Sequence, residues 1–175
     1  MTAQPKFNRE AVVKTLAAIS KAPAEQLGMS RYCKYQRGIK TSINCKTAYC
    51  IGGWMIAVTY PKYQYQSSDI DAYIVTIFGA YEDGGALLTR ALFYLDFIGV
   101  AGNQLDDLLA RLTGGHYTRL DAFDNLPAKI RKGAMCNVLQ GLLDTGEVDW
   151  ISAIDNAVKT ARWQEHKAIE PHSPV

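Results

Sequence analysis

The sequence has no long apolar stretch and little of the chemistry that marks enzymes. Its longest weakly polar run, residues 48–60, is shorter than the roughly 20 apolar residues that a membrane-spanning helix needs. The first ten residues lack the apolar core of a secretory signal. The chain has four cysteines and three histidines, and no catalytic motif stands out. We therefore expect a cytoplasmic protein that is not an enzyme and uses no cofactor or metal.

Strand-like alternation is lacking as well, whereas apolar residues recur at helical spacing in seven stretches. These stretches are 12–19, 51–58, 70–78, 88–97, 105–112, 130–142 and 149–161. The pattern predicts an all-α fold, a single compact bundle of about seven helices in residues 1–165 with a flexible tail over 166–175. The stretch 88–97 is apolar on nearly every side, so we expect it at the centre of the bundle.

The ends of several helices are predicted by capping residues, proline and glycine. Asn8 and Asn103 are expected to cap the helices that follow them, and Pro23 is expected to end the first helix. Gly114 and Gly146 follow two other periodic stretches, where glycine commonly closes a helix.

The cysteines are compatible with a metal site or a nucleophile, but buried thiols are the better interpretation. Cys33, Cys45 and Cys50 are spaced more loosely than the ligands of structural zinc sites. Cys50 would need a base such as His116 within hydrogen-bond reach to act as a nucleophile, and nothing in the sequence places the two together. A ligand pocket or active site near Cys50 and His116 is therefore the last of our functional hypotheses.

Two carboxylate pairs, Asp106–Asp107 and Asp121/Asp124, are candidates for binding a cation. Adjacent residues on a helix point away from each other, which disfavours the first pair. The second pair is typical of turn and capping residues, so we predict no cation site at either place.

The charge of the chain is unevenly distributed. Residues 1–66 contain ten Lys or Arg and two acidic residues, a net charge of +8, whereas residues 67–175 contain nine and fifteen, a net charge of −6. The two parts could simply attract each other in the fold, or the basic part could present a face to an acidic partner.

The segment 31–46 concentrates this charge, with five basic and no acidic residues interleaved with tyrosines. Cations beside tyrosines are typical of single-stranded nucleic-acid binding and equally of protein interfaces. A third interpretation is a solvated loop whose tyrosines lie on the core, and all three stay open. The candidate partner-binding residues are Arg31, Tyr32, Lys34, Tyr35, Arg37, Lys40, Lys62, Tyr63 and Tyr65.

Several pieces of the sequence resemble a loose group of small bacterial and phage proteins with no established activity. The resemblance is carried by the motif C-x-T-x-x-C-[IL]-x-G-W, which matches residues 45–54, and it covers roughly residues 8–60 and 127–150. It implies a phage or mobile-element context, with Cys45, Thr47, Cys50 and Trp54 as a core motif. The basic insertion at about residues 34–44 departs from the group and would be the specialising feature of this chain.

These observations predict a non-enzymatic binding protein that engages a host protein through the basic, tyrosine-rich segment, in the manner of an inhibitor of host defence or of a host nucleic-acid enzyme. Nucleic-acid binding by the same residues is the alternative. A homodimer is also compatible with the exposed tyrosines, and no membrane partner is expected.

Overall fold

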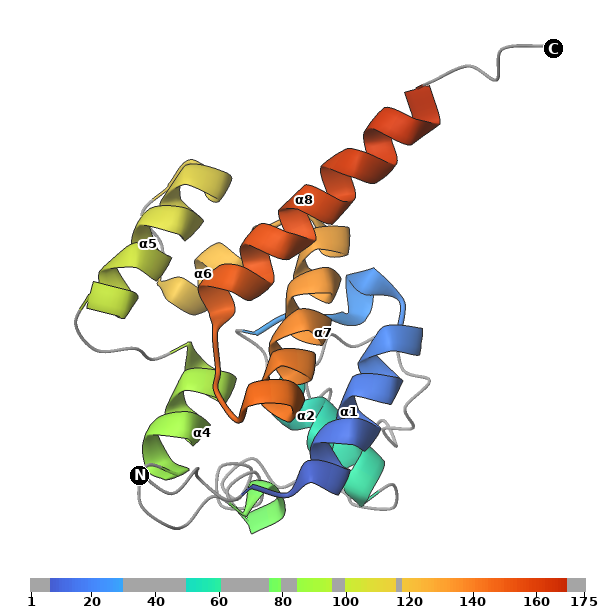
Figure 1. The fold of residues 1–175 in the computed structure, drawn as a ribbon, viewed down its shortest axis with the longest axis vertical. Helices are drawn as coiled ribbons and strands as arrows, with labels where there is room; N and C mark the ends of the chain where they lie inside the picture. The colour runs from blue at the N-terminus through green and yellow to red at the C-terminus, as the bar shows by residue number, and fades with distance from the viewer. Residues whose placement is uncertain are drawn as a thin grey trace, which may run out of the picture.

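The computed structural model describes residues 7–29, 50–60, 76–79, 85–95, 100–115 and 118–169. The helices in these ranges are α1 (Arg9–Lys21), η1 (a 3-10 helix, Ala24–Gln26), α2 (Ile51–Thr59), α4 (Gly85–Tyr94), α5 (Val100–Thr113), α6 (Arg119–Asp124), α7 (Ala128–Thr145) and α8 (Trp150–Ile169) (Figure 1). Every regular element of the described residues is helical, which confirms the predicted all-α bundle of about seven helices. Among these helices none is long and apolar enough to cross a membrane.

Capping residues fix the first helix as the sequence predicts. The Asn8 side chain accepts a hydrogen bond from the Ala11 N–H at 3.1 Å. The helix ends at Ala22, whose backbone is extended, directly before Pro23. The Asn8 N–H donates to the Phe78 carbonyl at 2.8 Å, which ties the start of α1 to residues 76–79.

Glycines in the left-handed conformation end two other helices, as expected. Gly114 follows α5 with φ 71°, and Gly146 follows α7 with φ 78° and donates its N–H to the Leu142 carbonyl. The expected cap at Asn103 is wrong, because α5 already begins at Val100 and Asn103 is an exposed residue of its first turn. An asparagine cap contributes only about 1 kcal/mol, which packing at the start of a helix can outweigh. Gly102, directly before Asn103, is buried, so this turn of α5 is packed against the rest of the fold.

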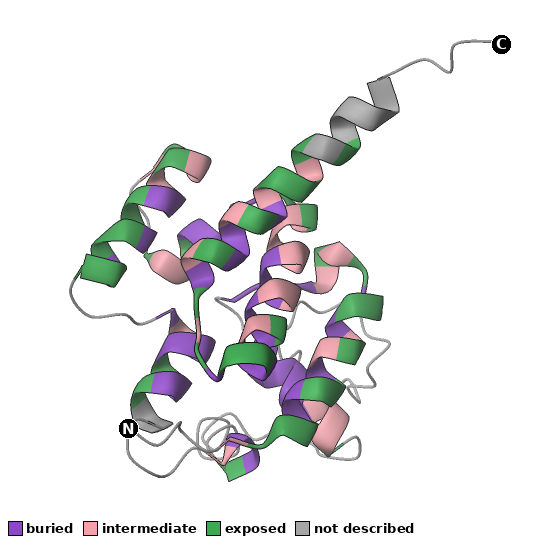
Figure 2. Ribbon diagram, in the orientation of Figure 1, coloured by how far each residue is buried: buried purple, intermediate pink, exposed green. Residues whose placement is uncertain are grey.

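The central element of the described bundle is α7, which contacts α8, α1 and η1 (Figure 1). Gly133 permits this packing, since a Cβ atom at this position would lie 3.0 Å from the Ala157 Cβ of α8. The expectation that the stretch 88–97 occupies the centre is therefore wrong. The described part of this stretch, residues 88–95, is buried except for the exposed Arg90 and the half-buried Tyr94, but α4 lies at the side of the described bundle (Figures 1 and 2). Its apolar composition therefore indicated burial, but burial alone does not place a helix at the centre.

Aromatic residues join the peripheral helices to the core. Phe78 stacks on Phe7 and meets Phe93 edge to face, with ring centroids 5.2 Å apart in the second pair. Trp150, at the start of α8, is fully buried against Phe123. Its indole N–H donates to the Ala91 carbonyl of α4 at 2.9 Å, so α8 is held to α4 by a buried hydrogen bond.

Candidate functional site

The nine candidate partner-binding residues lie in 30–49 and 61–75, outside the residues that the structure describes. The same holds for Cys33, Cys45 and His116. Their predicted roles therefore stay predictions. The structure does describe Met29 and Cys50, the residues on either side of 30–49. Both are buried.

The N-terminal side of the segment is held by Asp124, the last residue of α6. The Met29 N–H donates to the Asp124 carboxylate, with 2.5 Å between nitrogen and oxygen. Gly28 allows this close approach, because a Cβ atom there would lie 3.1 Å from both carboxylate oxygens. Asp124 thus fixes the backbone of Met29, a long-range role that its interpretation as a turn or capping residue does not include.

Cys50, the described residue that follows the segment, is also fixed in the fold. Cys50 is the N-cap of α2, and its sulfur accepts a hydrogen bond from the Gly53 N–H at 3.3 Å. Asp124 is close enough to contribute to the raised pKa of the Cys50 thiol. Met29 is thus hydrogen-bonded to the Asp124 carboxylate, and Cys50 is near enough to the same carboxylate to respond to its charge.

Two consecutive cations of α7 bind the residues that precede the segment. Arg131 donates from Nε to the Leu27 carbonyl at 3.0 Å, and from Nη1 to the carbonyls of Asp124 and Leu126 at 2.6 Å each. Lys132 donates to the Ala22 carbonyl at 2.8 Å. These bonds fasten residues 22–29 and the end of α6 to the central helix. We call Asp124, Arg131, Gly28, Met29 and Cys50 the anchor junction.

The chemistry of Cys50 speaks against a nucleophile. Its complete burial raises the pKa of the thiol to about 11, and the hydrogen bonds from the Gly53 and Gly52 backbone only partly offset this effect. The thiol is protonated at neutral pH, whereas a nucleophilic cysteine needs the thiolate. Among the described residues no group of three or more His, Cys, Asp or Glu side chains is arranged to hold a metal ion.

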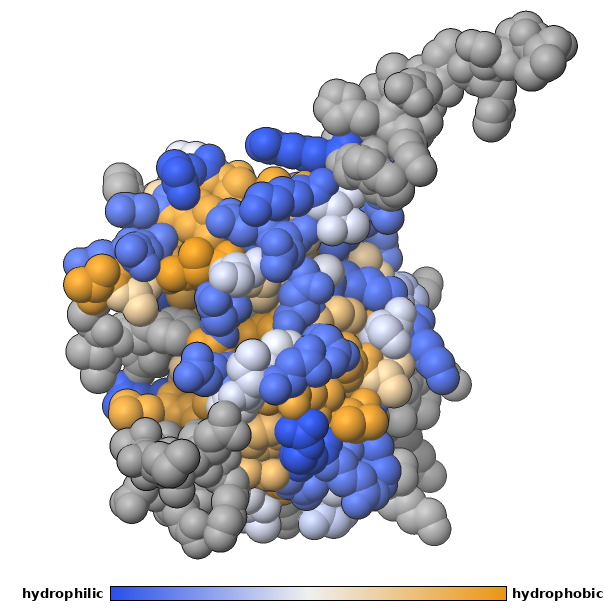
Figure 3. Space-filling model, viewed as in Figure 1, coloured by the Kyte–Doolittle hydropathy of each residue, from blue (hydrophilic) through white to orange (hydrophobic). Residues whose placement is uncertain are grey.

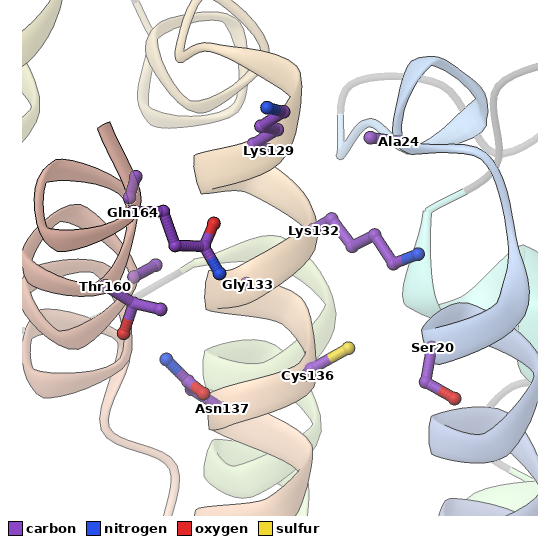
Figure 4. A pocket seen from close by; sticks show the side chains of 11 residues that line it. Ser20, Ala24, Lys129, Lys132, Gly133, Cys136, Asn137, Thr160 and Gln164 are labelled. Atoms are coloured by element: carbon purple, nitrogen blue, oxygen red, sulfur yellow. The ribbon is translucent and has the colours of Figure 1, made fainter. Parts of the chain in front are cut away.

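A groove of about 500 Å³ runs over α7, between α1 with η1 on one side and α8 on the other (Figure 4). Its lining residues are Ser20, Ala24, Lys129, Lys132, Gly133, Cys136, Asn137, Ala157, Thr160, Ala161 and Gln164. The groove contains the half-buried Cys136, whose pKa is raised by burial and held back by the nearby Lys132. We call it the α7 groove. No sequence motif indicated it, since its residues come from four separate elements.

A second hollow, of about 620 Å³, lies between α5 and α8, where apolar atoms are ringed by hydrophilic ones (Figure 3). Asp107 and Asp155 face it from the two helices, together with Arg111. Asp106 points elsewhere and forms a two-pronged ion pair with Arg119, at 2.6 and 2.9 Å, which lowers the pKa of its carboxyl group. Asp106 and Asp107 therefore face different neighbours.

Comparisons with known protein families, with curated proteins and with solved structures found no match. The resemblance to small bacterial and phage proteins stays an expectation, and the functional argument rests on the residues of this chain.

Proposed function

We propose that the chain is a non-enzymatic binding protein that engages an acidic surface of a host protein through its basic, tyrosine-rich segment. The observation that carries this proposal is the composition of residues 31–46, which contain five cations and no acid. Such a run has no internal counter-charge, so it is suited to an acidic partner. Tyr32 and Tyr35 would supply the large, weakly flexible contacts that protein interfaces favour.

The anchor junction supports this proposal. Asp124 fixes Met29, and Cys50 is buried as the cap of α2, so both residues that flank residues 30–49 are held by the described fold. A segment mounted in this way loses less entropy on binding than one whose ends move independently. The protonated, buried thiol of Cys50 also disfavours the alternative of an active site at this position.

The cellular role follows from the resemblance to bacterial and phage proteins. In that setting we propose a cytoplasmic inhibitor of a host defence protein or of a host enzyme that acts on nucleic acids. The long basic insertion is what distinguishes this chain from the group, so it is the part expected to select the target.

The proposal is tested by charge reversal of the segment. A variant with Arg31, Lys34, Arg37 and Lys40 all changed to Glu is compared with the wild type in affinity capture from host lysate, with and without nuclease. We expect one host protein to be retained by the wild type after nuclease and lost by the variant. The matched control changes four cations outside the segment, Lys21, Arg111, Lys159 and Arg162, to Glu, which alters the net charge equally and should leave capture intact.

The same experiment distinguishes nucleic-acid binding. If nuclease removes everything that the wild type retains, nucleic acid is the ligand, and affinity for a single-stranded oligonucleotide should fall with salt by a logarithmic slope of about −0.7 per phosphate neutralised. Retention of the host protein by the segment variant would contradict the proposal.

A further inference from the structure

We propose that the α7 groove is a second binding surface, which receives an acidic peptide segment of a protein partner. The inference does not depend on the basic segment, because every residue that carries it lies on α1, η1, α7 or α8 (Figure 4). The shape of the groove, its charge and its hydrogen-bonding groups each point to the same occupant.

Short side chains give the groove its shape. Gly133 lies on its floor, and α8 packs so closely there that a Cβ at Gly133 would be 3.0 Å from the Ala157 Cβ. Ala161 continues this wall along α8, and Ala24 lies on the opposite side. Walls of this kind allow the backbone of a peptide to approach, whereas long side chains would hold it away.

The charge of the groove has one sign. Both charged residues among those that line it are lysines, Lys129 and Lys132, and no carboxylate lines it in the described part of the chain. Lys129 is in the first turn of α7, which has neither a side-chain cap nor an acidic residue there. The positive end of the helix dipole therefore adds to the lysine charge, since no acidic residue in this turn offsets it. Carboxylates are the groups that complement such a surface.

The hydrogen-bonding groups favour a peptide over a nucleic acid. The hydroxyl groups of Ser20 and Thr160 donate their protons to helix carbonyls, at 2.9 and 2.8 Å, so their oxygens can accept from a ligand. Peptide N–H groups are donors of the right kind, and a phosphodiester backbone has none. Among the described side chains that line the groove none is aromatic, so they offer no stacking of the kind on which single-stranded nucleic-acid binding relies.

The probe for this proposal is a short fluorescent peptide of alternating Glu and Ala, with the matching Gln and Ala peptide as its neutral counterpart. Binding is measured by fluorescence anisotropy, and the contact surface by NMR chemical shifts of the isotope-labelled full chain. We expect the acidic peptide to bind, the neutral one to bind at least about fivefold more weakly, and the shifts to cluster on the residues of the groove. Bound peptide should also slow alkylation of Cys136.

Two variants locate the site. Lys129→Glu should weaken binding of the acidic peptide by at least about fivefold, since it replaces an attraction by a repulsion. Ala161→Leu should weaken it by filling the groove. The matched control is Lys159→Glu, an equal charge change at an exposed position of α8 that does not line the groove, and it should leave binding unchanged.

The proposal fails if Lys159→Glu weakens binding as much as Lys129→Glu, or if the shifts fall outside the groove. It also fails if an oligonucleotide of equal charge displaces the peptide from these residues, or if the chain by itself associates with a second copy through them. The variant with reversed charges in the segment 31–40 should still bind the peptide in the groove. This result separates the second surface from the proposed function of the basic segment.

Discussion

At the scale of single residues, Asp124 has the most consequential position. Its carboxylate accepts the Met29 N–H, its backbone carbonyl accepts from Arg131, and it acts on the thiol of Cys50. One residue thus connects α6 with Met29 through its side chain and with the central helix through its backbone carbonyl. Nothing adjacent to Asp124 in the sequence signals this role, because Met29 is 95 residues away along the chain.

Replacement of Asp124 by alanine tests the anchor junction. We expect Asp124→Ala to lower the free energy of unfolding by about 1–3 kcal/mol, since it leaves a partly buried N–H without its acceptor. Asp121→Ala is the control in the same helix, where the carboxylate is exposed and accepts only from the Thr118 hydroxyl, and it should cost less than about 1 kcal/mol. Urea denaturation of both variants gives the comparison, and equal costs would contradict the anchoring role.

At the scale of helices, glycine has different roles within α7 and directly after its C-terminal end. Gly146 ends the helix with φ 78°, a backbone conformation that residues other than glycine rarely adopt. Gly141 lies within the helix, and nothing lies within 4 Å of the position that its Cβ would take. The same substitution should therefore have opposite effects at two positions of one helix.

We expect Gly146→Ala to lower the free energy of unfolding by about 1 kcal/mol, because alanine is strained in the left-handed region. Gly141→Ala should raise it by about 0.5–1 kcal/mol, because alanine restricts the unfolded chain and favours the helix. Thermal unfolding followed by circular dichroism measures both. If Gly141→Ala also destabilised the protein, the open surroundings of Gly141 would be contradicted.

The sequence predicted elements whose signals are local. The cap at Asn8, the stop at Pro23 and the glycines after α5 and α7 each act within a few residues of their own helix end, so they could be recognised without the fold. Asn103 misled because a side chain that favours a cap is also tolerated in a first turn when packing extends the helix.

The arrangement of the helices could not be predicted in the same way. Apolar composition placed the stretch 88–97 at the centre, but the centre is α7, whose surroundings are decided by long-range contacts such as Lys132 with Ala22 and Arg131 with Leu27. The α7 groove was missed for the same reason. Spacing along one helix reports which face is apolar, and not which other helix covers it.

At the scale of the whole molecule, the described helices share one continuous core. Its buried residues extend from Ala11 in α1 to Ala157 in α8, and it includes Trp54 of α2 and Trp150 of α8. The two tryptophans thus report on different parts of the same cluster. A core without an internal boundary should unfold as one unit, so the predicted single domain over residues 1–165 leads to a measurable consequence.

We expect both tryptophans to report one cooperative transition. In a Trp54→Phe, Trp163→Phe variant the fluorescence comes from Trp150, and in a Trp150→Phe, Trp163→Phe variant it comes from Trp54. Within each variant, urea unfolding followed by fluorescence should coincide with unfolding followed by far-ultraviolet circular dichroism.

The second variant should unfold at a lower urea concentration than a protein that carries Trp163→Phe alone. The reason is that it loses the indole hydrogen bond to Ala91, which is worth about 1 kcal/mol. Both of its signals should shift together. If the fluorescence of Trp54 changed before the helical signal, α2 would form a separate unit, and Cys50, which follows residues 30–49, would lie on a part that opens independently of α7 and α8.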